Sequence, residues 1–289
     1  LVSLIYDDGS FSAFLYSLLV IFTLGMLMFL STSRTKKDLG TRDGFLIVTL
    51  FWAVLGTAGC LPFLFSSALE LSITDAIFES LSGLTTTGAT VISGLDGLPK
   101  SILFYRQELQ WLGGMGIIVL AISLLPMLGI GGMQLYRAES PGPVKDNKLV
   151  PRLAETAKAL WFIYLSLTIA CALAYWIFGM DPFDAISHSF TTIAIGGFST
   201  HDASLGYFDN PAIDIVAIVF MFIAGVNFAL HFTAWQRRSI RHYVLDPEFL
   251  FYAFILLVIS LITISVLYFS DIYSGMFEST IKGVFQVVS

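Results

Sequence analysis

Charged residues are scarce in this sequence. Asp, Glu, Lys and Arg make up 12% of its 289 residues, and hydrophobic residues make up 56%, whereas a soluble domain has about 25% charged residues. This composition excludes an ordinary soluble protein and predicts an all-α polytopic membrane protein. The net charge of −6 says less than the positions of the charges, because Lys and Arg beside the spans set their orientation.

Cysteines and catalytic residue patterns are also sparse. Cys60 and Cys171 lie in apolar stretches, which predicts small buried side chains and argues against a disulfide framework or a metal site. The sequence lacks a His/Asp metal cluster, a suitably spaced Ser/His pair and a phosphate-binding loop, so we expect neither an enzyme nor an organic cofactor. It shows no cleavable signal peptide and opens within an apolar stretch, so we expect it to begin in the last part of an earlier element.

The apolar residues form six stretches long enough to cross a bilayer, which takes about 20 residues of helix. Twelve of the 15 basic residues follow the first, third and fifth stretches, so those connections are predicted to be cytoplasmic and the opposite loops external. The predicted spans are 11–30, 45–65, 102–128, 159–178, 212–235 and 249–269, and the twelve basic residues are Arg34, Lys36, Lys37, Arg42, Arg137, Lys145, Lys148, Arg152, Lys158, Arg237, Arg238 and Arg241.

Two further apolar stretches, 72–84 and 181–193, are too short to span the bilayer. Each would form a helix about 20 Å long, which enters the membrane partway and must return on the same side. Each is followed by a glycine-containing segment, 85–90 in the first case and 194–199 in the second. The sequence therefore predicts two re-entrant pore loops.

The start signals of these two short helices lie 109 positions apart. Ser72 with Asp75 is typical of a capping box, and Asp181 precedes Pro182 and Asp184 in a similar arrangement. A register shared without a gap across span, loop and span indicates a duplicated unit. The same offset relates Trp52 to Trp161, Asp75 to Asp184, Ala76 to Ala185, Ile77 to Ile186, Ser80 to Ser189, Gly88 to Gly197 and Gly116 to Gly225.

A third copy of this unit begins near the end of the chain. Residues 279–286 align with 72–79 at an offset of 207, with Lys282 in place of the acid near the cap. The chain stops at Ser289, before the expected glycine segment, so we expect either a longer chain or several copies around one pore. The predicted parts are 1–44 (a partial hairpin and loop), 45–135 (first repeat), 136–158 (cytoplasmic connector), 159–242 (second repeat) and 243–289 (start of the third repeat).

The two glycine segments suit an ion path. The C-terminal end of a helix carries partial negative charge, and main-chain carbonyl oxygens can replace the water around a potassium ion. Gly88 and Gly197 permit the turn that such a segment requires. The external loop 179–214 contains aspartates but no Lys or Arg, which would concentrate cations there. The hydroxyl oxygens nearby belong to Thr86, Thr87 and Thr90, and the aspartates are Asp181, Asp184, Asp202, Asp209 and Asp214.

Three stretches carry a more specific resemblance: 78–90 (FESLSGLTTTGAT), 111–116 (WLGGMG) and 195–200 (IGGFST). Through them the chain resembles the Trk/Ktr/HKT superfamily of potassium transporters, and within it the bacterial potassium-uptake subunits. The resemblance covers nearly the whole chain, as roughly the first two and a half repeats. It implies four repeats around one pseudo-symmetric pore, each giving one filter glycine, and gated, channel-like potassium uptake across the bacterial inner membrane.

The same resemblance implies site residues and partners. The third and fourth filter segments, the gating loop and a pore-blocking arginine would lie beyond Ser289. A cytosolic nucleotide-binding regulatory ring (TrkA-like) would bind the basic loops 137–158 and 236–242, unless these basic residues only set the topology. A homodimer in membrane lipid is also implied, and no nucleic acid. The implied filter is Thr86, Thr87, Gly88, Ile195, Gly196 and Gly197, with K⁺ at Thr86, Thr87, Ile195 and Gly196.

A few polar residues in the apolar segments are candidates for filter support. Glu79 and His188 occupy equivalent positions in the two short helices and could hold the filter from behind by hydrogen bonds. Asn227 and His231, four positions apart in the fifth span, would share one helix face and face either the cavity below the filter or a neighbouring helix. Arg106 is expected to pair with Glu108 near the outer mouth. The cluster 113–116 would permit either a bend or close packing against the short helix.

Two other functions remain open at this point. A secondary transporter that couples K⁺ to H⁺ or Na⁺ would need a site with alternating access, for which Glu79 or His188 are candidates. A membrane-embedded enzyme or assembly factor would need a catalytic constellation at one interface, which the sequence does not offer.

Overall fold

The computed structural model describes residues 1–33, 41–116, 150–273 and 275–289, which form only helices and loops. The chain divides into two compact units, Leu1–Lys158 and Ala159–Ser289. Several predicted features lie outside the described residues: the cytoplasmic end of the third span and most of the connector 136–158. Six of the twelve cytoplasmic basic residues lie there too, namely Arg34, Lys36, Lys37, Arg137, Lys145 and Lys148.

Three single helices in the described residues are long and apolar enough to cross a membrane: α2 (Phe11–Thr32), the part of α9 (Val150–Ile177) from Lys158 onward, and α14 (Pro247–Phe269). They confirm the predicted first, fourth and sixth spans. All three are apolar around most of their circumference, as expected for helices that face lipid.

The predicted second span is not one continuous helix. α3 (Thr41–Ala58) stops short of α4 (Leu61–Phe65). Pro62 lies in the first turn of α4. Proline has no N–H and cannot donate the main-chain hydrogen bond that the interior of a helix requires, so it is tolerated in a first turn. The sequence contained this break signal, but the uniform hydrophobicity of the stretch concealed it.

The predicted fifth span is also broken. α11 (Pro211–Ala224) and α12 (Phe228–Gln236) meet at an angle of 85°. Asn227 lies at the break, where its side-chain oxygen accepts a hydrogen bond of 3.0 Å from the Ala229 N–H and caps α12. Asn227 and His231 therefore do not lie in one continuous fifth span: both belong to α12, Asn227 as its cap and His231 inside it.

His231 joins the broken segments. Its Nε2 donates to the Ile223 carbonyl near the end of α11 at 3.0 Å, and the Tyr243 hydroxyl in α13 (Arg241–Leu245) lies 2.8 Å from its Nδ1. A carbonyl only accepts, so Nε2 carries the proton and Tyr243 donates to Nδ1. Of the two roles open to His231, the structure assigns a hydrogen bond between helices.

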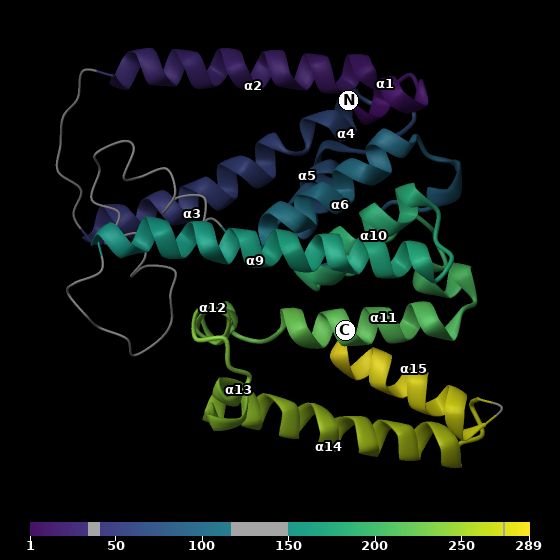
Figure 1. Ribbon diagram of the computed structural model, residues 1–289. Coiled ribbons are helices and arrows are strands. Elements are labelled where there is room, and N and C mark those ends of the chain that lie inside the picture. The colour runs from purple at the N-terminus through teal and green to yellow at the C-terminus, as the bar shows by residue number, and fades with distance from the viewer. Residues whose placement is uncertain (34–40, 117–149, 274) are drawn as a thin grey trace. The chain divides into compact units, whose positions relative to one another are not determined.

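In the first unit, the short helix α5 (Ile73–Leu84) packs between α3 and α6 (Lys100–Gly114), and Figure 1 shows these segments side by side. Glycines permit the close approach. A Cβ at Gly113 would overlap the Leu84 carbonyl, and a Cβ at Gly56 would overlap the Leu81 side chain. Of the two roles considered for the cluster 113–116, close packing is thus confirmed at Gly113. The buried core beside α5 consists of Cys60, Phe63, Ala76, Ile102 and Leu109.

The N-terminal helix α1 (Val2–Tyr6) is tied to α6 through Asp8. Its carboxylate accepts hydrogen bonds from the Ser3 hydroxyl at 2.7 Å, the Ser10 N–H at 3.1 Å and the Ser101 N–H in the first turn of α6 at 2.8 Å. Burial by itself would raise the pKa of Asp8, but these hydrogen bonds outweigh it and the pKa is lowered. The carboxylate also lies at the favourable end of the α6 dipole. A short 3₁₀ turn, η1 (Leu95–Gly97), precedes α6.

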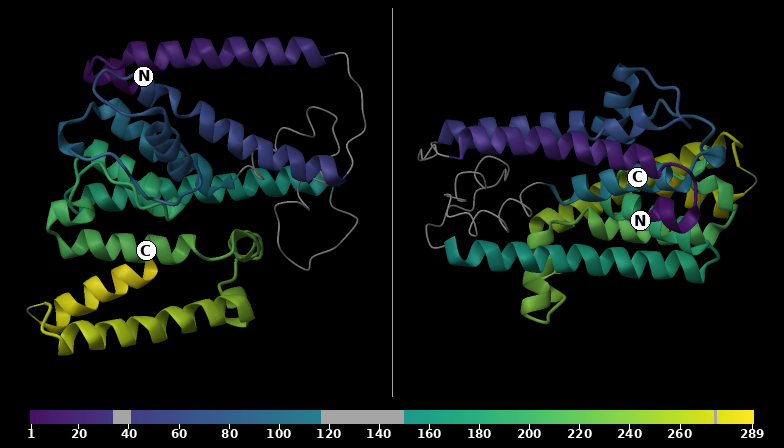
Figure 2. Two further views of the ribbon diagram at one scale, coloured as in Figure 1. Left: turned by 180° about the vertical axis from the view of Figure 1, so that it is seen from behind. Right: turned by 90° about the horizontal axis from the view of Figure 1, so that it is seen from above.

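In the second unit, α10 (Pro182–Ala194) contacts α11, and α15 (Met276–Val288) packs against both α11 and α14. Figure 2 shows α14 and α15 together in both views. Tyr175 of α9 hydrogen-bonds Thr192 of α10 through their hydroxyls at 2.7 Å. Cys171 is buried and, like Cys60, is not in a disulfide, as predicted. The turn η2 (Ser204–Phe208) lies between α10 and α11.

The third short helix begins earlier than the repeat predicts. An offset of 207 from Ser72 places the cap at Ser279, but α15 starts at Met276, and Ser279 is fully buried inside it. Lys282 therefore lies in the middle of α15 rather than at its cap. Its Nζ lies 2.6 Å from the Asp214 carboxylate of α11, so the substitution of lysine for the acid serves an ion pair between helices.

Candidate functional site

The two short helices α5 and α10 begin with side-chain caps, as predicted. The Ser72 hydroxyl accepts from the Asp75 N–H at 3.1 Å, and the Asp181 carboxylate accepts from the Asp184 N–H at 2.7 Å. The first cap differs in detail from a capping box, because the Ser72 hydroxyl donates back to the Asp75 carboxylate at 2.7 Å. Both caps fix where the helices start.

The end of α5 turns out of the helix through main-chain hydrogen bonds. The Thr86 N–H donates to the Gly83 carbonyl at 3.0 Å, and the Thr87 N–H donates to the Ser82 carbonyl at 2.9 Å. Thr86 has a positive φ of 55°. This is the Schellman arrangement, which satisfies the carbonyls that a helix end leaves without partners.

The end of α10 repeats the arrangement at the offset of 109. The Ile195 N–H donates to the Thr192 carbonyl at 3.2 Å, and the Gly196 N–H donates to the Thr191 carbonyl at 2.9 Å. Ile195 has a φ of 51°. The two loops that follow α5 and α10, residues 85–92 and 194–201, are called loop 1 and loop 2 below.

Both loops hold a β-branched residue in a left-handed conformation. This region is unusual for any residue with a Cβ and strained for Thr or Ile, and such strain costs about 1–3 kcal/mol at one residue. Two positions further, Gly88 and Gly197 also have positive φ, of 75° and 85°. Strain that recurs at the same position of two repeats points to a functional backbone path, because packing alone would favour glycine at the strained position.

In loop 1 the Glu79 carboxylate of α5 is the centre of a hydrogen-bond network. It accepts from the Thr90 hydroxyl at 2.9 and 3.0 Å and from the Val91 N–H at 3.0 Å. Arg106 of α6 donates from Nε to the same carboxylate at 2.8 Å and from a terminal nitrogen to the Thr90 hydroxyl at 3.0 Å. Both side chains of the ion pair are 0% exposed. The network ties Thr90 and Val91 of loop 1 to α5 and α6.

This network corrects two expectations. Arg106 does not form a pair with Glu108 at the outer mouth, because it is buried against Glu79. The Thr90 hydroxyl is not an additional oxygen for an ion, because the Glu79–Arg106 pair uses it. The Thr87 hydroxyl contacts the Thr85 hydroxyl at 2.8 Å, and Thr85 in turn donates to the Leu81 carbonyl.

In loop 2 the equivalent positions form a network without an arginine. His188 Nδ1 lies 2.9 Å from the Asp184 carbonyl and must donate to it, while Nε2 lies 2.9 Å from the Ser199 hydroxyl. Ser199 is the equivalent of Thr90, and each accepts a hydrogen bond of 3.1 Å from the N–H two residues later, that of His201 or Ile92.

A second carboxylate completes loop 2. Asp184 accepts from the Thr200 hydroxyl at 2.7 Å and from His201 Nε2 at 3.1 Å. The His201 ring stacks on the Tyr207 ring, with centroids 3.5 Å apart. The equivalent aspartate of the first repeat, Asp75, is half-buried, and its hydrogen bonds go to Ser72 at the start of its own helix. Loop 2 is consequently the more buried of the two, with Gly197 as its one exposed residue between 194 and 200.

The aspartates of the loop 179–214 are mostly occupied by the protein itself. Asp181 caps α10, Asp184 binds loop 2, and Asp214 pairs with Lys282. Asp202 and Asp209 are exposed. At least three of the five aspartates therefore have partners within the protein, and the loop offers less negative charge to an ion than its composition indicates.

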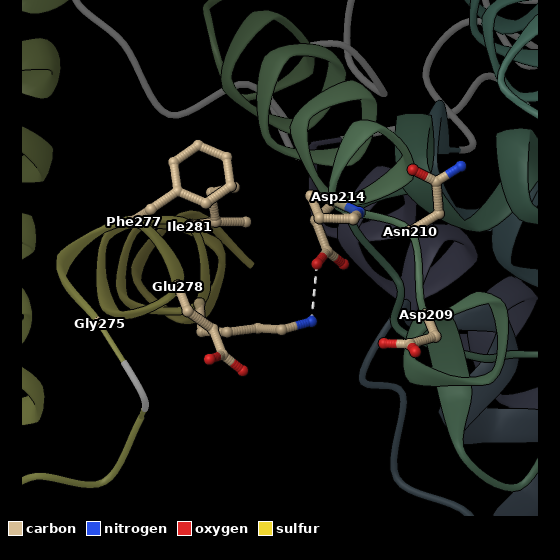
Figure 3. A pocket seen from close by; sticks show the side chains of 9 residues that line it. Asp209, Asn210, Asp214, Gly275, Phe277, Glu278 and Ile281 are labelled. Carbon is tan, nitrogen blue, oxygen red and sulfur yellow. Dashed lines mark hydrogen bonds and ion pairs between the residues drawn. The ribbon is translucent and has the colours of Figure 1, made fainter.

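The Asp214–Lys282 pair lies in a cleft between α11 and α15 with a volume of about 430 Å³, and Figure 3 shows Asp209 and Glu278 around it. The Lys282 ammonium already balances one of the three carboxylates of the cleft. The described residues include no group of three or more His, Cys, Asp or Glu arranged to hold a metal ion.

Of the three residues expected to support the filter, Glu79 and His188 hydrogen-bond the loops and Asn227 does not. The Asn227 side chain caps α12, so we interpret it as a helix cap. Sequence reasoning assigned Arg106 to the wrong partner, because its true partner Glu79 lies 27 positions away. It missed the role of Ser199, which the offset of 109 from Thr90 could have indicated.

Comparison with known proteins adds to this geometry. Residues 10–286 match the family model described as TrkH, cation transport protein. The Trk system potassium uptake protein TrkH of Escherichia coli K12 is 57% identical over 289 residues, which are 100% of this chain and 60% of that protein. TrkG of the same strain is 42% identical over 262 residues, which cover 91% of this chain and 54% of that protein.

A solved structure is also similar. The crystal structure of the potassium transporter TrkH from Vibrio parahaemolyticus superposes with a TM-score of 0.85 and 53% identity, covering 99% of this chain and 58% of that one. Apolar spanning helices, short capped helices between them and this likeness define the class as an all-α membrane transport protein. The chain belongs to the TrkH family of cation transport proteins. This is a family of transporters, so the expectation that the chain is not an enzyme is confirmed.

The chain spans about 60% of the length of the TrkH proteins it matches.

Proposed function

We propose that the chain is part of a potassium-uptake protein of the bacterial cytoplasmic membrane, in which K⁺ passes a ring of main-chain oxygens. The observation that carries the proposal is the identical main-chain cap of loops 1 and 2, with positive φ at Thr86 and Ile195 and again at Gly88 and Gly197. Both loops keep the same backbone path although it is strained at Thr86 and Ile195. Such a path would hold main-chain oxygens at fixed distances from an ion. The relatives named as potassium uptake proteins support the choice of ion.

In this proposal K⁺ is coordinated by the peptide oxygens of Thr86 and Thr87 in loop 1 and of Ile195 and Gly196 in loop 2, and Gly88 and Gly197 permit the turn. The C-terminal ends of α5 and α10 add partial negative charge. The remaining filter segments come from outside these residues, in keeping with four repeats around one pore.

The route into the cell would be gated from the cytoplasm by a nucleotide-binding regulatory ring. Arg237, Arg238 and Arg241 follow α12 and are exposed, which suits such a docking surface as well as it suits the positive-inside rule. A homodimer embedded in lipid, with the acidic loops outside, completes the proposal.

Coupling of K⁺ to H⁺ or Na⁺ is the alternative. A proton carrier must change its exposure during the cycle, whereas Glu79 and His188 are both buried and hydrogen-bonded to the loops. That arrangement favours a supporting role. Flux measured in vesicles without a pH or Na⁺ gradient separates the two: uncoupled uptake reverses at the K⁺ equilibrium potential, and coupled uptake does not.

The filter itself is tested by replacing Gly88 and, separately, Gly197 with serine in the intact protein. A side chain at a positive φ of 75° or 85° should shift the main-chain oxygens and lower the K⁺/Na⁺ permeability ratio. Gly97→Ser is the matched control, because a Cβ there meets no atom within 4 Å. Unchanged selectivity in both filter variants would refute the proposed filter.

A further inference from the structure

We propose that Arg106 determines cation selectivity at loop 1, as a positioning residue that acts through Glu79 and Thr90. The inference rests on the proposed function, because it concerns the ion that loop 1 contacts. Arg106 itself lies behind the loop and is buried, so its effect on an ion is indirect.

The first argument is the closed geometry of the network. Arg106 donates to the Glu79 carboxylate at 2.8 Å and to the Thr90 hydroxyl at 3.0 Å, and Thr90 donates to the same carboxylate at 2.9 Å. Three side chains thus form a triangle in which each contacts the other two. Thr90 is two residues beyond Gly88, so the triangle fixes one end of the strained turn while the Schellman bonds fix the other.

The second argument is charge. Glu79 and Arg106 are both 0% exposed, and a buried ion pair is stable only while both partners remain. With the arginine present, the environment behind loop 1 is close to neutral. Without it, a carboxylate would be left beside the loop in a low dielectric, where its attraction for a cation is many times stronger than in water.

An uncompensated carboxylate changes which cations are favoured. Small ions and divalent ions gain more from it than K⁺ because their charge density is higher. Arg106 therefore serves two purposes. It holds Thr90 of loop 1 in place, and it cancels the field of the Glu79 carboxylate, which would favour Na⁺ and Ca²⁺ over K⁺.

The second repeat shows that loop 2 has no equivalent of this role in the described residues. The position equivalent to Arg106 is Ile215, which is 45% exposed, and the residue equivalent to Glu79 is His188, which binds Ser199 without a cationic partner. Selectivity should accordingly depend on a charged pair at loop 1 and on a different network at loop 2.

The test uses three variants of the intact protein in vesicles: Arg106→Gln, Arg106→Lys and Thr90→Val. The readouts are the K⁺/Na⁺ permeability ratio from the reversal potential and the sensitivity to external Ca²⁺. Neither readout depends on how much protein folds. Lys100→Gln is the control, because Lys100 is a cation on the same helix whose ammonium lies over the Tyr6 ring at 4.5 Å.

We expect Arg106→Gln to lower the permeability ratio several-fold and to strengthen block by Ca²⁺, Arg106→Lys to restore most of both, and Lys100→Gln to match the wild type. If Arg106→Gln does not fold, Thr90→Val decides: the hydroxyl lies in an exposed residue, and its loss should lower the ratio while the charge pair remains. A wild-type protein that prefers K⁺ together with unchanged ratios in the folded variants overturns the inference. A wild type with no preference for K⁺ overturns the proposed function instead.

Discussion

Loop 1 and loop 2 share their backbone and differ in what holds it. The hydrogen bonds that close the ends of α5 and α10 are the same at an offset of 109, and so are the signs of φ at Thr86 and Ile195. Behind the backbone, one repeat has the buried Glu79–Arg106 pair and the other has His188 with Ser199. The path of the main chain is thus the feature that the two loops share, and each loop is supported by different side-chain chemistry.

The largest effect is expected from exchanging the two side chains that support the loops, Glu79 and His188. Glu79→His would leave Arg106 buried without its carboxylate, and His188→Glu would bury a carboxylate where the equivalent of Arg106 is Ile215. Loss of a buried charge partner costs about 3–5 kcal/mol, so both variants should unfold well below the wild-type temperature, measured as monodisperse protein that survives heating in detergent.

The exchange has an internal control. His188→Gln keeps a neutral hydrogen-bonding side chain at the second support and should be much milder than His188→Glu. Equal losses from His188→Gln and His188→Glu would mean that shape, and not charge, distinguishes the two networks.

An intermediate effect is expected where α6 contacts α5. Gly113→Ala places a methyl group against the Leu84 carbonyl, and overpacking of this kind costs about 1–3 kcal/mol. Because Leu84 immediately precedes loop 1, conduction should fall together with the melting temperature. The position in the second repeat is Phe222, so this close approach is specific to the first repeat.

Gly97→Ala is the matched control for that prediction, since its surroundings are open. A melting temperature of Gly113→Ala equal to that of Gly97→Ala would show that the helices separate easily and that the contact does not hold loop 1.

The smallest effect is expected at the equivalent aspartates, Asp184 and Asp75. Asp184→Asn weakens hydrogen bonds to Thr200 and His201 and should cost about 1–1.5 kcal/mol. Asp75→Asn removes a charge at a helix start and weakens one hydrogen bond from Ser72, and it should cost about 0.3–1 kcal/mol. Thermal melting of the two variants side by side measures the difference, and a larger loss for Asp75→Asn would reverse the assignment of roles.

Much of this architecture could be predicted from local patterns. The spans at α2, α9 and α14 followed from hydrophobic length, and the starts of α5 and α10 followed from Ser72 and Asp181. The breaks near Pro62 and Asn227 had local signals as well, but these were outweighed by continuous hydrophobicity. The start of α15 was misplaced because a repeat register fixes which residues correspond and leaves the length of the helix before them open.

The sequence alone indicated that the chain lies in a membrane, that matching residues recur at an offset of 109 and that a glycine follows each short helix, because these properties depend on composition and on spacing along the chain. Only the tertiary structure decided that Arg106 binds Glu79, that Thr90 and Ser199 hold the loops and that Lys282 binds Asp214. The partner of a buried polar side chain is chosen by which helices approach closely enough to exclude water, and that choice is made across distances in the sequence that no local pattern records.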